Sequence, residues 1–245
     1  MKQGLRVLNT RPKHQAAALS RSIIEAGGLV IECPTLEISA TQPDWTQALP
    51  DLQKVDLAIF ISPNAVHFCF AELQKQQIIW PNTIKVCALG QGTAKALEQQ
   101  GLNLLEIPNL ADSEHLLELK SLKNLKNQTV LLFKGEGGRT LIEESLLKRG
   151  AKLIKLAVYK RELPQFNKQL LESIWRNDGV DIILVTSEQS LNNLFLMFGS
   201  EAQSWLQSKL CLVLSERLAQ YAASLGIKKI KRCQPDTIIN ALFET

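Results

Sequence analysis

The chain has 245 residues, of which 45% are hydrophobic and 21% charged, and its formal net charge is +4. This balance is typical of a globular protein and excludes a disordered chain. The sequence has no dense run of lysine or arginine, so nothing indicates a nucleic-acid partner. No apolar run approaches the roughly 20 residues that a membrane helix needs, and the first residues lack the apolar stretch of a signal peptide. We therefore expect a soluble, cytoplasmic protein without membrane contact.

The cysteine and histidine pattern gives no support for a metal or disulfide site. The 5 cysteines are odd in number, none belongs to a C-x-x-C pair, and the 3 histidines lie far apart. This argues against a secreted disulfide framework and against a zinc site. No cluster of Asp and Glu indicates another metal, so we expect none.

In chain order, short runs rich in Val, Ile and Leu alternate with longer amphipathic stretches. The runs predict strands at 5–8, 29–31, 57–61, 85–89, 104–107, 130–133, 153–158, 182–185, 210–214 and 229–230. Many runs are unbroken rather than alternating, as expected for strands that are buried on both faces. Helical patterns at 15–26, 94–100, 139–149 and 218–225 are each followed by a glycine, which stops a helix cheaply. Repeated β-α-β units of this kind predict an α/β fold with parallel sheets.

The sequence repeats itself at an offset of about 125 residues. Segment 56–62 matches 181–187, 85–90 matches 210–215, and 5–10 matches 129–134. The period is too long and the copies are too few for a solenoid. We therefore predict two similar parallel-sheet α/β domains.

Two connectors decide how the repeats are shared between the domains. The segments at about 34–40 and 158–164 lie at equivalent places, alternate polar and apolar residues, and are flanked by proline. If they pair as a two-stranded ribbon, residues 40–158 form an inserted domain. Residues 1–36 and 163–245 then form the other, discontinuous domain. Two crossings predict a hinge, with a ligand cleft between the domains.

Loops that follow the predicted strands are rich in hydroxyl, glycine and cationic residues. In parallel sheets, ligands bind beyond the carboxyl ends of the strands, and helix N-termini offer free N–H groups to anions. The loops are 9–12, 62–64, 90–93, 134–139, 187–188 and 215–217. Ser62, Asn64, Ser187 and Ser215 are equally good helix N-caps without any ligand. Loop 134–139 has three glycines between two cations, which suits an anion-binding loop. Such loops also occur in many α/β proteins without a ligand, so a binding role and a purely structural role both stay open.

Familiar catalytic signatures are missing. The glycine pairs at 90–92 and 135–137 lack the third glycine of a dinucleotide site, because Lys95 and Thr140 stand there. There is no P-loop and no nucleophile elbow. One candidate acid is Tyr159 on the second connector, whose phenol is either a proton donor or an interfacial aromatic that anchors the ribbon.

An ordered succession of short motifs resembles the uroporphyrinogen-III synthase family. The motifs span the chain and lie at 7–12, Pro34, 60–66, 88–94, 113–117, 135–139, 158–164, 186–187 and 215–217. The resemblance implies two α/β domains joined by a two-stranded ribbon. It also implies a hydro-lyase, which cyclises hydroxymethylbilane, a linear tetrapyrrole, into uroporphyrinogen III with inversion of ring D and loss of water. No cofactor or metal takes part in the implied reaction.

The resemblance also implies roles for individual residues. Tyr159 matches the family's candidate for protonating the leaving hydroxyl. The eight carboxylates of the substrate are expected to contact Thr10, Arg11, Ser62, Asn64, Gly90, Thr93, Lys134, Gly135, Arg139, Ser187 and Ser215. The family further implies a monomer, and we expect a transient contact with the enzyme that forms hydroxymethylbilane.

Two departures from the repeat bear on these roles. Leu218 stands where the matching loop has the hydroxyl of Thr93, which makes Ser215 a less secure contact. Glu188 is acidic beside a predicted anion site, and is unfavourable there unless it points away.

Two alternative functions stay open. One is a non-catalytic, two-lobed binder of an anionic small molecule, either a tetrapyrrole or a phosphate-bearing compound. The other is a nucleotide or sugar-phosphate enzyme that uses loop 134–139.

Overall fold

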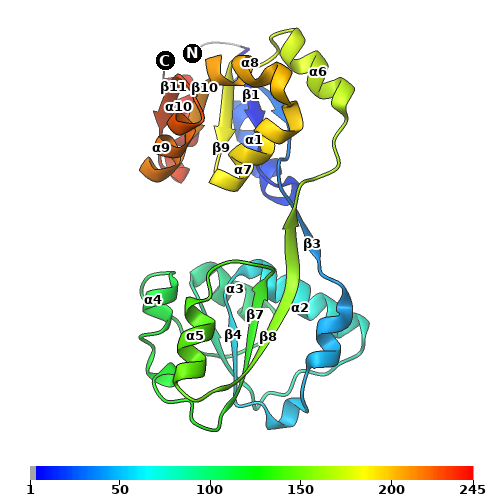
Figure 1. Ribbon diagram of the computed structural model, residues 1–245, viewed down its shortest axis with the longest axis vertical. Coiled ribbons are helices and arrows are strands. Elements are labelled where there is room, and N and C mark those ends of the chain that lie inside the picture. The colour runs from blue at the N-terminus through cyan, green and yellow to red at the C-terminus, as the bar shows by residue number, and fades with distance from the viewer. Residues whose placement is uncertain (1–3, 245) are drawn as a thin grey trace. The chain divides into compact units, whose positions relative to one another are not determined.

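The computed structural model describes residues 4–244, and its contacts divide the chain into two units (Figure 1). Unit 1 runs as far as Ile38 and resumes at Glu162, whereas unit 2 comprises Ser39–Arg161. The chain leaves unit 1 along strand β3 (Glu37–Ala40) and returns at the end of β8 (Lys152–Glu162). Residues 1–3 and 245, which the expected discontinuous domain includes, lie outside the described residues.

Unit 1 contains a five-stranded sheet in the order β11-β10-β9-β1-β2, and every neighbouring pair is parallel. Its strands are β1 (Arg6–Asn9), β2 (Leu29–Glu32), β9 (Ile182–Val185), β10 (Leu210–Val213) and β11 (Lys229–Arg232). Its helices are α1 (Lys13–Glu25), α6 (Lys168–Arg176), α7 (Glu188–Phe198), α8 (Gln203–Ser208), α9 (Glu216–Ser224) and α10 (Ile238–Phe243). Short 3-10 helices lie at Ser200–Ala202 and Pro235–Thr237.

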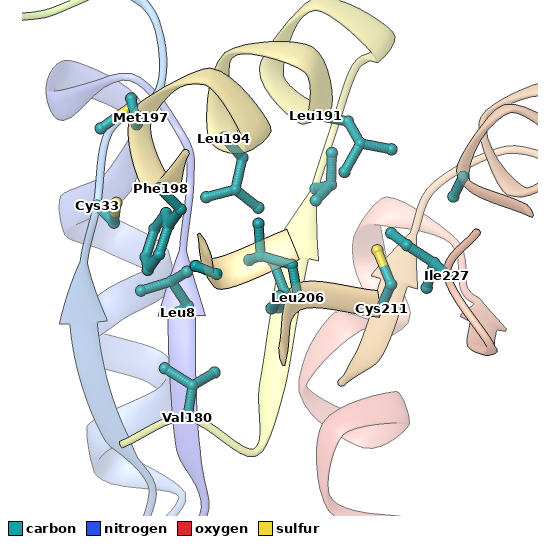
Figure 2. Packing of buried hydrophobic residues seen from close by; sticks show 14 of the residues in the cluster. Leu8, Cys33, Val180, Leu191, Leu194, Met197, Phe198, Leu206, Cys211 and Ile227 are labelled. Carbon is teal, nitrogen blue, oxygen red and sulfur yellow. The ribbon is translucent and has the colours of Figure 1, made fainter. Parts of the chain in front are cut away.

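Alternate residues of the unit 1 strands pack on opposite faces of the sheet, because side chains alternate along a strand. On one face, Leu8 and Cys211 contact residues of α7 and α8, and Figure 2 shows this cluster. On the other face, Val7 and Leu212 pack with residues of α1 and α10. Burial on both faces explains the unbroken apolar runs in the sequence.

Unit 2 contains a six-stranded sheet in the order β3-β8-β7-β4-β5-β6. Its further strands are β4 (Leu57–Phe60), β5 (Lys85–Ala88), β6 (Leu104–Glu106) and β7 (Thr129–Gly135), and the pairs from β8 to β6 are parallel. Its helices are α2 (Pro63–Lys75), α3 (Gln91–Gln99), α4 (Ser113–Leu116) and α5 (Leu141–Lys148). Short 3-10 helices lie at Pro43–Ala48, Leu52–Lys54 and Lys120–Leu122.

The two strand orders confirm the predicted pair of similar parallel-sheet α/β folds. In unit 1, β9, β10 and β11 take the places that β4, β5 and β6 take in unit 2, and β1 and β2 take those of β7 and β8. The matched copies differ in chain order, since the first pair of strands precedes the other three in unit 1 and follows them in unit 2.

The predicted helix ends are confirmed, and the helix starts differ from the prediction. After each of the helices α1, α3, α5 and α9 comes one further residue and then a glycine. The four glycines adopt φ between +76° and +88°. Helix α3 starts at Gln91 and α9 at Glu216, earlier than the apolar periodicity indicates, because their first turns are polar. Helix α5 starts later, at Leu141, because Gly137 and Gly138 before it have positive φ.

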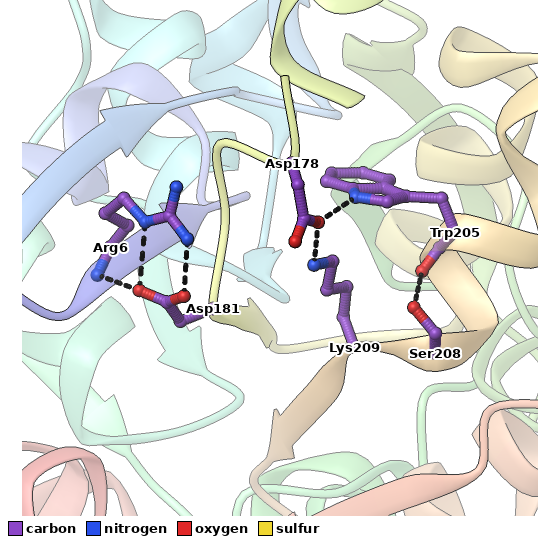
Figure 3. A network of polar contacts seen from close by, with 6 residues as sticks. All are labelled: Arg6, Asp178, Asp181, Trp205, Ser208 and Lys209. Carbon is purple, nitrogen blue, oxygen red and sulfur yellow. Dashed lines mark hydrogen bonds and ion pairs between the residues drawn. The ribbon is translucent and has the colours of Figure 1, made fainter. Parts of the chain in front are cut away.

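A polar layer joins the amino-terminal ends of three unit 1 strands, opposite to the loops that carry the predicted site (Figure 3). Arg6 at the start of β1 donates to Asp181 before β9 through its backbone N–H (2.8 Å), Nε (3.1 Å) and Nη2 (2.7 Å). Lys209 before β10 forms an ion pair with Asp178, which also accepts from Trp205 Nε1 at 2.7 Å. These contacts fix the strand starts relative to one another.

Candidate functional site

The phenol of Tyr159 lies at the carboxyl end of the unit 2 sheet and is 2% exposed. Ser62 Oγ donates to its Oη at 3.1 Å, and Arg161 Nη2 donates to the same oxygen at 3.3 Å. The guanidinium carbon of Arg161 lies 5.6 Å from the ring centroid, and the Phe68 ring stacks at 6.0 Å. Because β4, β7 and β8 are parallel, the residues that follow them meet at one edge of the sheet.

Gly135 at the end of β7 makes room for this phenol. The register of β7 and β8 shifts after Lys134, and the shift sets Gly135 opposite Tyr159. A Cβ at position 135 would lie 2.7 Å from Tyr159 Cζ and 3.0 Å from Oη, closer than packed atoms approach. The close approach of ring and backbone therefore requires glycine here.

Ser62 has two roles in the structure. Its Oγ accepts the N–H of Ala65 at 3.0 Å and so caps helix α2, while it also donates to Tyr159. Ser187 and Ser215 cap α7 and α9 in the same way, which confirms these three residues as N-caps. Asn64, the fourth residue named as a possible cap, is instead the second residue of α2.

A pocket of ≈ 240 Å³ lies beside Ser62 where the N-termini of α2 and α3 meet. It brings together three predicted contact residues, Ser62, Gly90 and Thr93. A Cβ on Gly90 would lie 2.6 Å from Ala111 Cβ, so only glycine fits at this α3 N-cap. Helix α3 presents the N–H groups of its first residues, Gln91 and Gly92, at this pocket, whereas α2 begins with Pro63, which has no N–H. The N-terminus of a helix suits a carboxylate.

The two cations of loop 134–139 are both ion-paired. Lys134 binds Glu143 of α5, and Lys155 lies 3.3 Å from the same carboxylate. Burial opposes ionisation of Glu143, but the hydrogen bonds from the two lysines outweigh it and lower the pKa of Glu143 below its ordinary value. Arg139 is exposed, with Nη1 3.7 Å from Glu114 Oε1. The loop therefore offers less free positive charge than its sequence indicates.

In unit 1, Thr10 is fully buried and its hydroxyl is used internally. Thr10 Oγ1 donates to the carbonyl of Leu184 at 2.7 Å and lies 3.0 Å from Ser190 Oγ. Ser190 Oγ is also 2.6 Å from Thr35 Oγ1, and Asn193 donates to the Thr35 carbonyl at 2.7 Å. This hydroxyl cluster joins the end of β1 to α7 and to the segment after β2.

Arg11, next to Thr10, is a half-buried cation. Its backbone N–H donates to Asn9 Oδ1 at 3.3 Å, and within residues 4–244 its guanidinium forms no ion pair. Burial lowers the pKa of Arg11 from its ordinary value, which a nearby Cys233 only partly offsets. A partly desolvated charge without a carboxylate is costly unless an anion joins it.

Glu188 at the start of α7 does not leave a free negative charge at the unit 1 loops. Arg217 Nε lies 3.0 Å from Glu188 Oε1, so the two charges compensate. Ser187 is half-buried and Ser215 exposed, each at the N-terminus of a helix.

The structure thus groups Tyr159, Ser62 and Gly135 in unit 2, with Gly90 and Thr93 at the adjacent pocket. Arg161 contacts the phenol but is not among the residues predicted for the site, although the sequence holds a signal for its position. Residues two apart on a strand share a face, so position 161 lies on the side of β8 that carries Tyr159. No group of three His, Cys, Asp or Glu side chains in the described part of the chain could hold a metal ion, and no helix in it is long and apolar enough to cross a membrane.

Comparison with known proteins gives a consistent result. A family model described as uroporphyrinogen-III synthase HemD matches residues 17–238. The uroporphyrinogen-III synthase of Salmonella typhimurium is 31% identical over 243 residues, covering 96% of this chain and 99% of that protein. The enzyme of the same name from Escherichia coli matches with the same identity and coverage.

Solved structures show a similar fold. A uroporphyrinogen III synthase mutant from Thermus thermophilus superposes with a TM-score of 0.65 at 18% identity, covering 98% of this chain and 96% of that one. Uroporphyrinogen-III synthetase from Helicobacter pylori gives 0.63 at 17% identity, with coverage of 98% and 97%. At these identities the likeness supports the fold alone.

Proposed function

Because the chain belongs to the uroporphyrinogen-III synthase family, we propose that it cyclises hydroxymethylbilane to uroporphyrinogen III, with inversion of ring D and loss of water. The observation that carries this function is the family match over residues 17–238, together with near full-length relatives that bear the same name. The enzyme is a lyase.

The substrate brings most of the chemistry with it. Its hydroxymethyl group is the leaving group, and loss of the hydroxyl leaves an electrophilic azafulvene that an electron-rich pyrrole attacks. Unassisted closure gives the uninverted type I isomer. The protein must therefore hold the chain so that the substituted position of ring D attacks, and positioning of this kind lowers barriers substantially.

Tyr159 is the proposed acid that protonates the leaving hydroxyl. Its support is geometric: a phenol 2% exposed, held by Ser62 and Arg161 and fitted against Gly135. Ser62, which donates to the phenol, also lines the adjacent pocket at the N-termini of α2 and α3. A general acid typically contributes about 10²–10⁴-fold, so its loss slows the reaction without abolishing it.

Substrate carboxylates have several proposed contacts. Arg11 in unit 1 is a cation whose guanidinium forms no ion pair within residues 4–244, and its burial favours an anionic ligand. The N-termini of α2 and α3 supply N–H groups around Ser62, Asn64, Gly90 and Thr93, and those of α7 and α9 supply them at Ser187 and Ser215. Lys134 and Arg139 have smaller proposed shares, because Glu143 and Glu114 already pair with them. Thr10 has an indirect proposed role, because its internal hydrogen bonds hold the backbone beside Arg11.

Three further properties rest on the family resemblance. We propose that the protein is a cytoplasmic monomer, and that it contacts the enzyme that forms hydroxymethylbilane only transiently. Light scattering on a size-exclusion column tests the monomer. Crosslinking during turnover, with and without the upstream enzyme, tests the contact.

The function is tested by a coupled assay. Hydroxymethylbilane is generated in situ, this protein is added in substoichiometric amount, and the oxidised products are separated into type I and type III isomers. We expect type III to dominate. Type I alone, formed at the uncatalysed rate, would contradict the enzyme. Retained binding of the linear tetrapyrrole in that case would favour the non-catalytic binder.

A further inference from the structure

The hydroxyl of Tyr159 has its acceptor sites filled. A phenol oxygen accepts two hydrogen bonds and donates one. Ser62 Oγ and Arg161 Nη2 are both donors to it, at 3.1 and 3.3 Å. Ser62 accepts the N–H of Ala65, which leaves its own proton for the phenol. The Tyr159 proton therefore points away from both neighbours.

The two donors differ in charge. Ser62 is neutral, whereas Arg161 is a permanent cation whose guanidinium lies over the ring, 5.6 Å from its centroid. When the phenol becomes a phenolate, the attraction between two opposite charges is added to the Arg161 hydrogen bond. The Arg161 contact therefore favours the state that follows proton donation.

We propose that Arg161 is a positioning residue for the Tyr159 acid, which directs the phenol proton toward the substrate and stabilises the resulting phenolate. This inference rests on the proposed role of Tyr159. In the step, the O–H bond of Tyr159 breaks and its proton joins the leaving hydroxyl. The substrate C–O bond breaks and water departs, leaving an azafulvenium cation and a phenolate. The proton that the attacking pyrrole system releases on closure returns to Tyr159.

The charges that face this group come from each neighbouring element. Arg161 is the cation on β8 itself, and Ser62 presents the positive end of α2. On the β7 side, Lys134 is neutralised by Glu143. Among the residues that the structure describes, the charged side chain in contact with the phenol is therefore the guanidinium of Arg161.

The test measures kcat and KM for variants of positions 161 and 159. Arg161→Gln should lower kcat roughly tenfold, the effect of one hydrogen bond to a charged group, with KM changed less than about twofold. Arg161→Lys should recover part of kcat. Arg161→Met, which keeps apolar cover over the ring but no donor or charge, should behave like Arg161→Gln. In a Tyr159→Phe background, Arg161→Gln should have no further effect.

The outcomes separate the inference from the proposed function. If Tyr159→Phe leaves kcat unchanged, the acid role fails and the inference fails with it. If Tyr159→Phe lowers kcat but Arg161→Gln lowers it equally in both backgrounds, only the inference is overturned. Full activity of Arg161→Met would also overturn the inference, because apolar packing over the Tyr159 ring would then be enough without a charge or a hydrogen bond. Arg21→Gln on α1 is the matched exposed-arginine control, and all variants are compared for thermal unfolding.

Discussion

Tyr159 and Gly135 lie opposite each other in the register of β8 and β7, and the phenol occupies the space that a side chain at position 135 would fill. Neighbouring residues set the orientation of the Tyr159 ring. The backbone of Gly135 packs against the ring and Phe68 stacks on it, while Ser62 and Arg161 donate hydrogen bonds to its oxygen.

Gly135→Ala should displace the phenol. The added methyl would come within 2.7 Å of Tyr159 Cζ, so ring or strand must shift. Misplacement by about 1 Å can cost on the order of 10²-fold in rate, and overpacking typically costs about 1–3 kcal/mol of stability. We expect kcat to fall at least tenfold, measured by the coupled assay, with a lower midpoint in urea. Unchanged kcat would show that the fit of Tyr159 against Gly135 is not needed for the reaction.

Ser62→Ala should lower both stability and kcat. The variant loses the N-cap of α2, which is worth about 1 kcal/mol, and the hydrogen bond to Tyr159. Asn167→Ala is the matched control, because Asn167 caps α6 through the N–H of Leu170 at 3.2 Å and does not contact the phenol. Equal kcat losses in the two variants would assign the Ser62 effect to helix capping alone.

Arg11→Gln should weaken substrate binding without weakening the fold. Its half-buried guanidinium has no carboxylate in the described residues, so the neutral amide removes an uncompensated charge. We expect KM to rise roughly tenfold, the value of one charged hydrogen bond, while kcat stays within about twofold. The free energy of unfolding should be equal or higher. A fall in stability with unchanged KM would instead make Arg11 a structural residue.

Lys134→Met should destabilise the protein, because it leaves Glu143 in a largely buried place with only the more exposed Lys155. A loss of about 1–3 kcal/mol is expected from an unmatched buried group. The double variant Lys134→Met with Glu143→Met should recover most of that loss, since apolar pairs replace buried ion pairs well. We expect its KM to rise less than about twofold. A larger rise in the stable double variant would restore Lys134 as a substrate contact.

The Arg6–Asp181 contact should make stability fall in acid. The hydrogen bonds from Arg6 hold the pKa of Asp181 below its ordinary value, so its contribution is complete above the unfolded pKa and is lost as the pH falls through the folded one. At pH 7, Asp181→Asn should cost about 1 kcal/mol, a small value because the carboxylate is partly solvated. The difference from the unmodified protein should narrow below about pH 4, as measured by urea unfolding across the pH range. A difference independent of pH would contradict the ion-pair origin.

Local patterns in the sequence predicted much of the fold. Unbroken apolar runs indicated strands buried on both faces, and the glycines at 27, 101, 150 and 226 marked where four helices end. These signals are local, because strand burial and a left-handed residue depend on a few neighbours. The internal repeat then indicated two similar sheets, and the ordered motifs indicated the family.

What the side chains at the loops contact was decided by the tertiary structure. The sequence treats Thr10, Arg11 and Lys134 alike, as polar residues after a strand. In the folded protein the Thr10 hydroxyl donates to the carbonyl of Leu184, and the Lys134 ammonium forms an ion pair with Glu143. Arg11 is half-buried, and no carboxylate in the described residues pairs with it. Likewise, the meeting of Tyr159 with Ser62 joins residues that lie 97 positions apart. Such pairings depend on which strands are neighbours and on their register, and these follow only when the whole core packs.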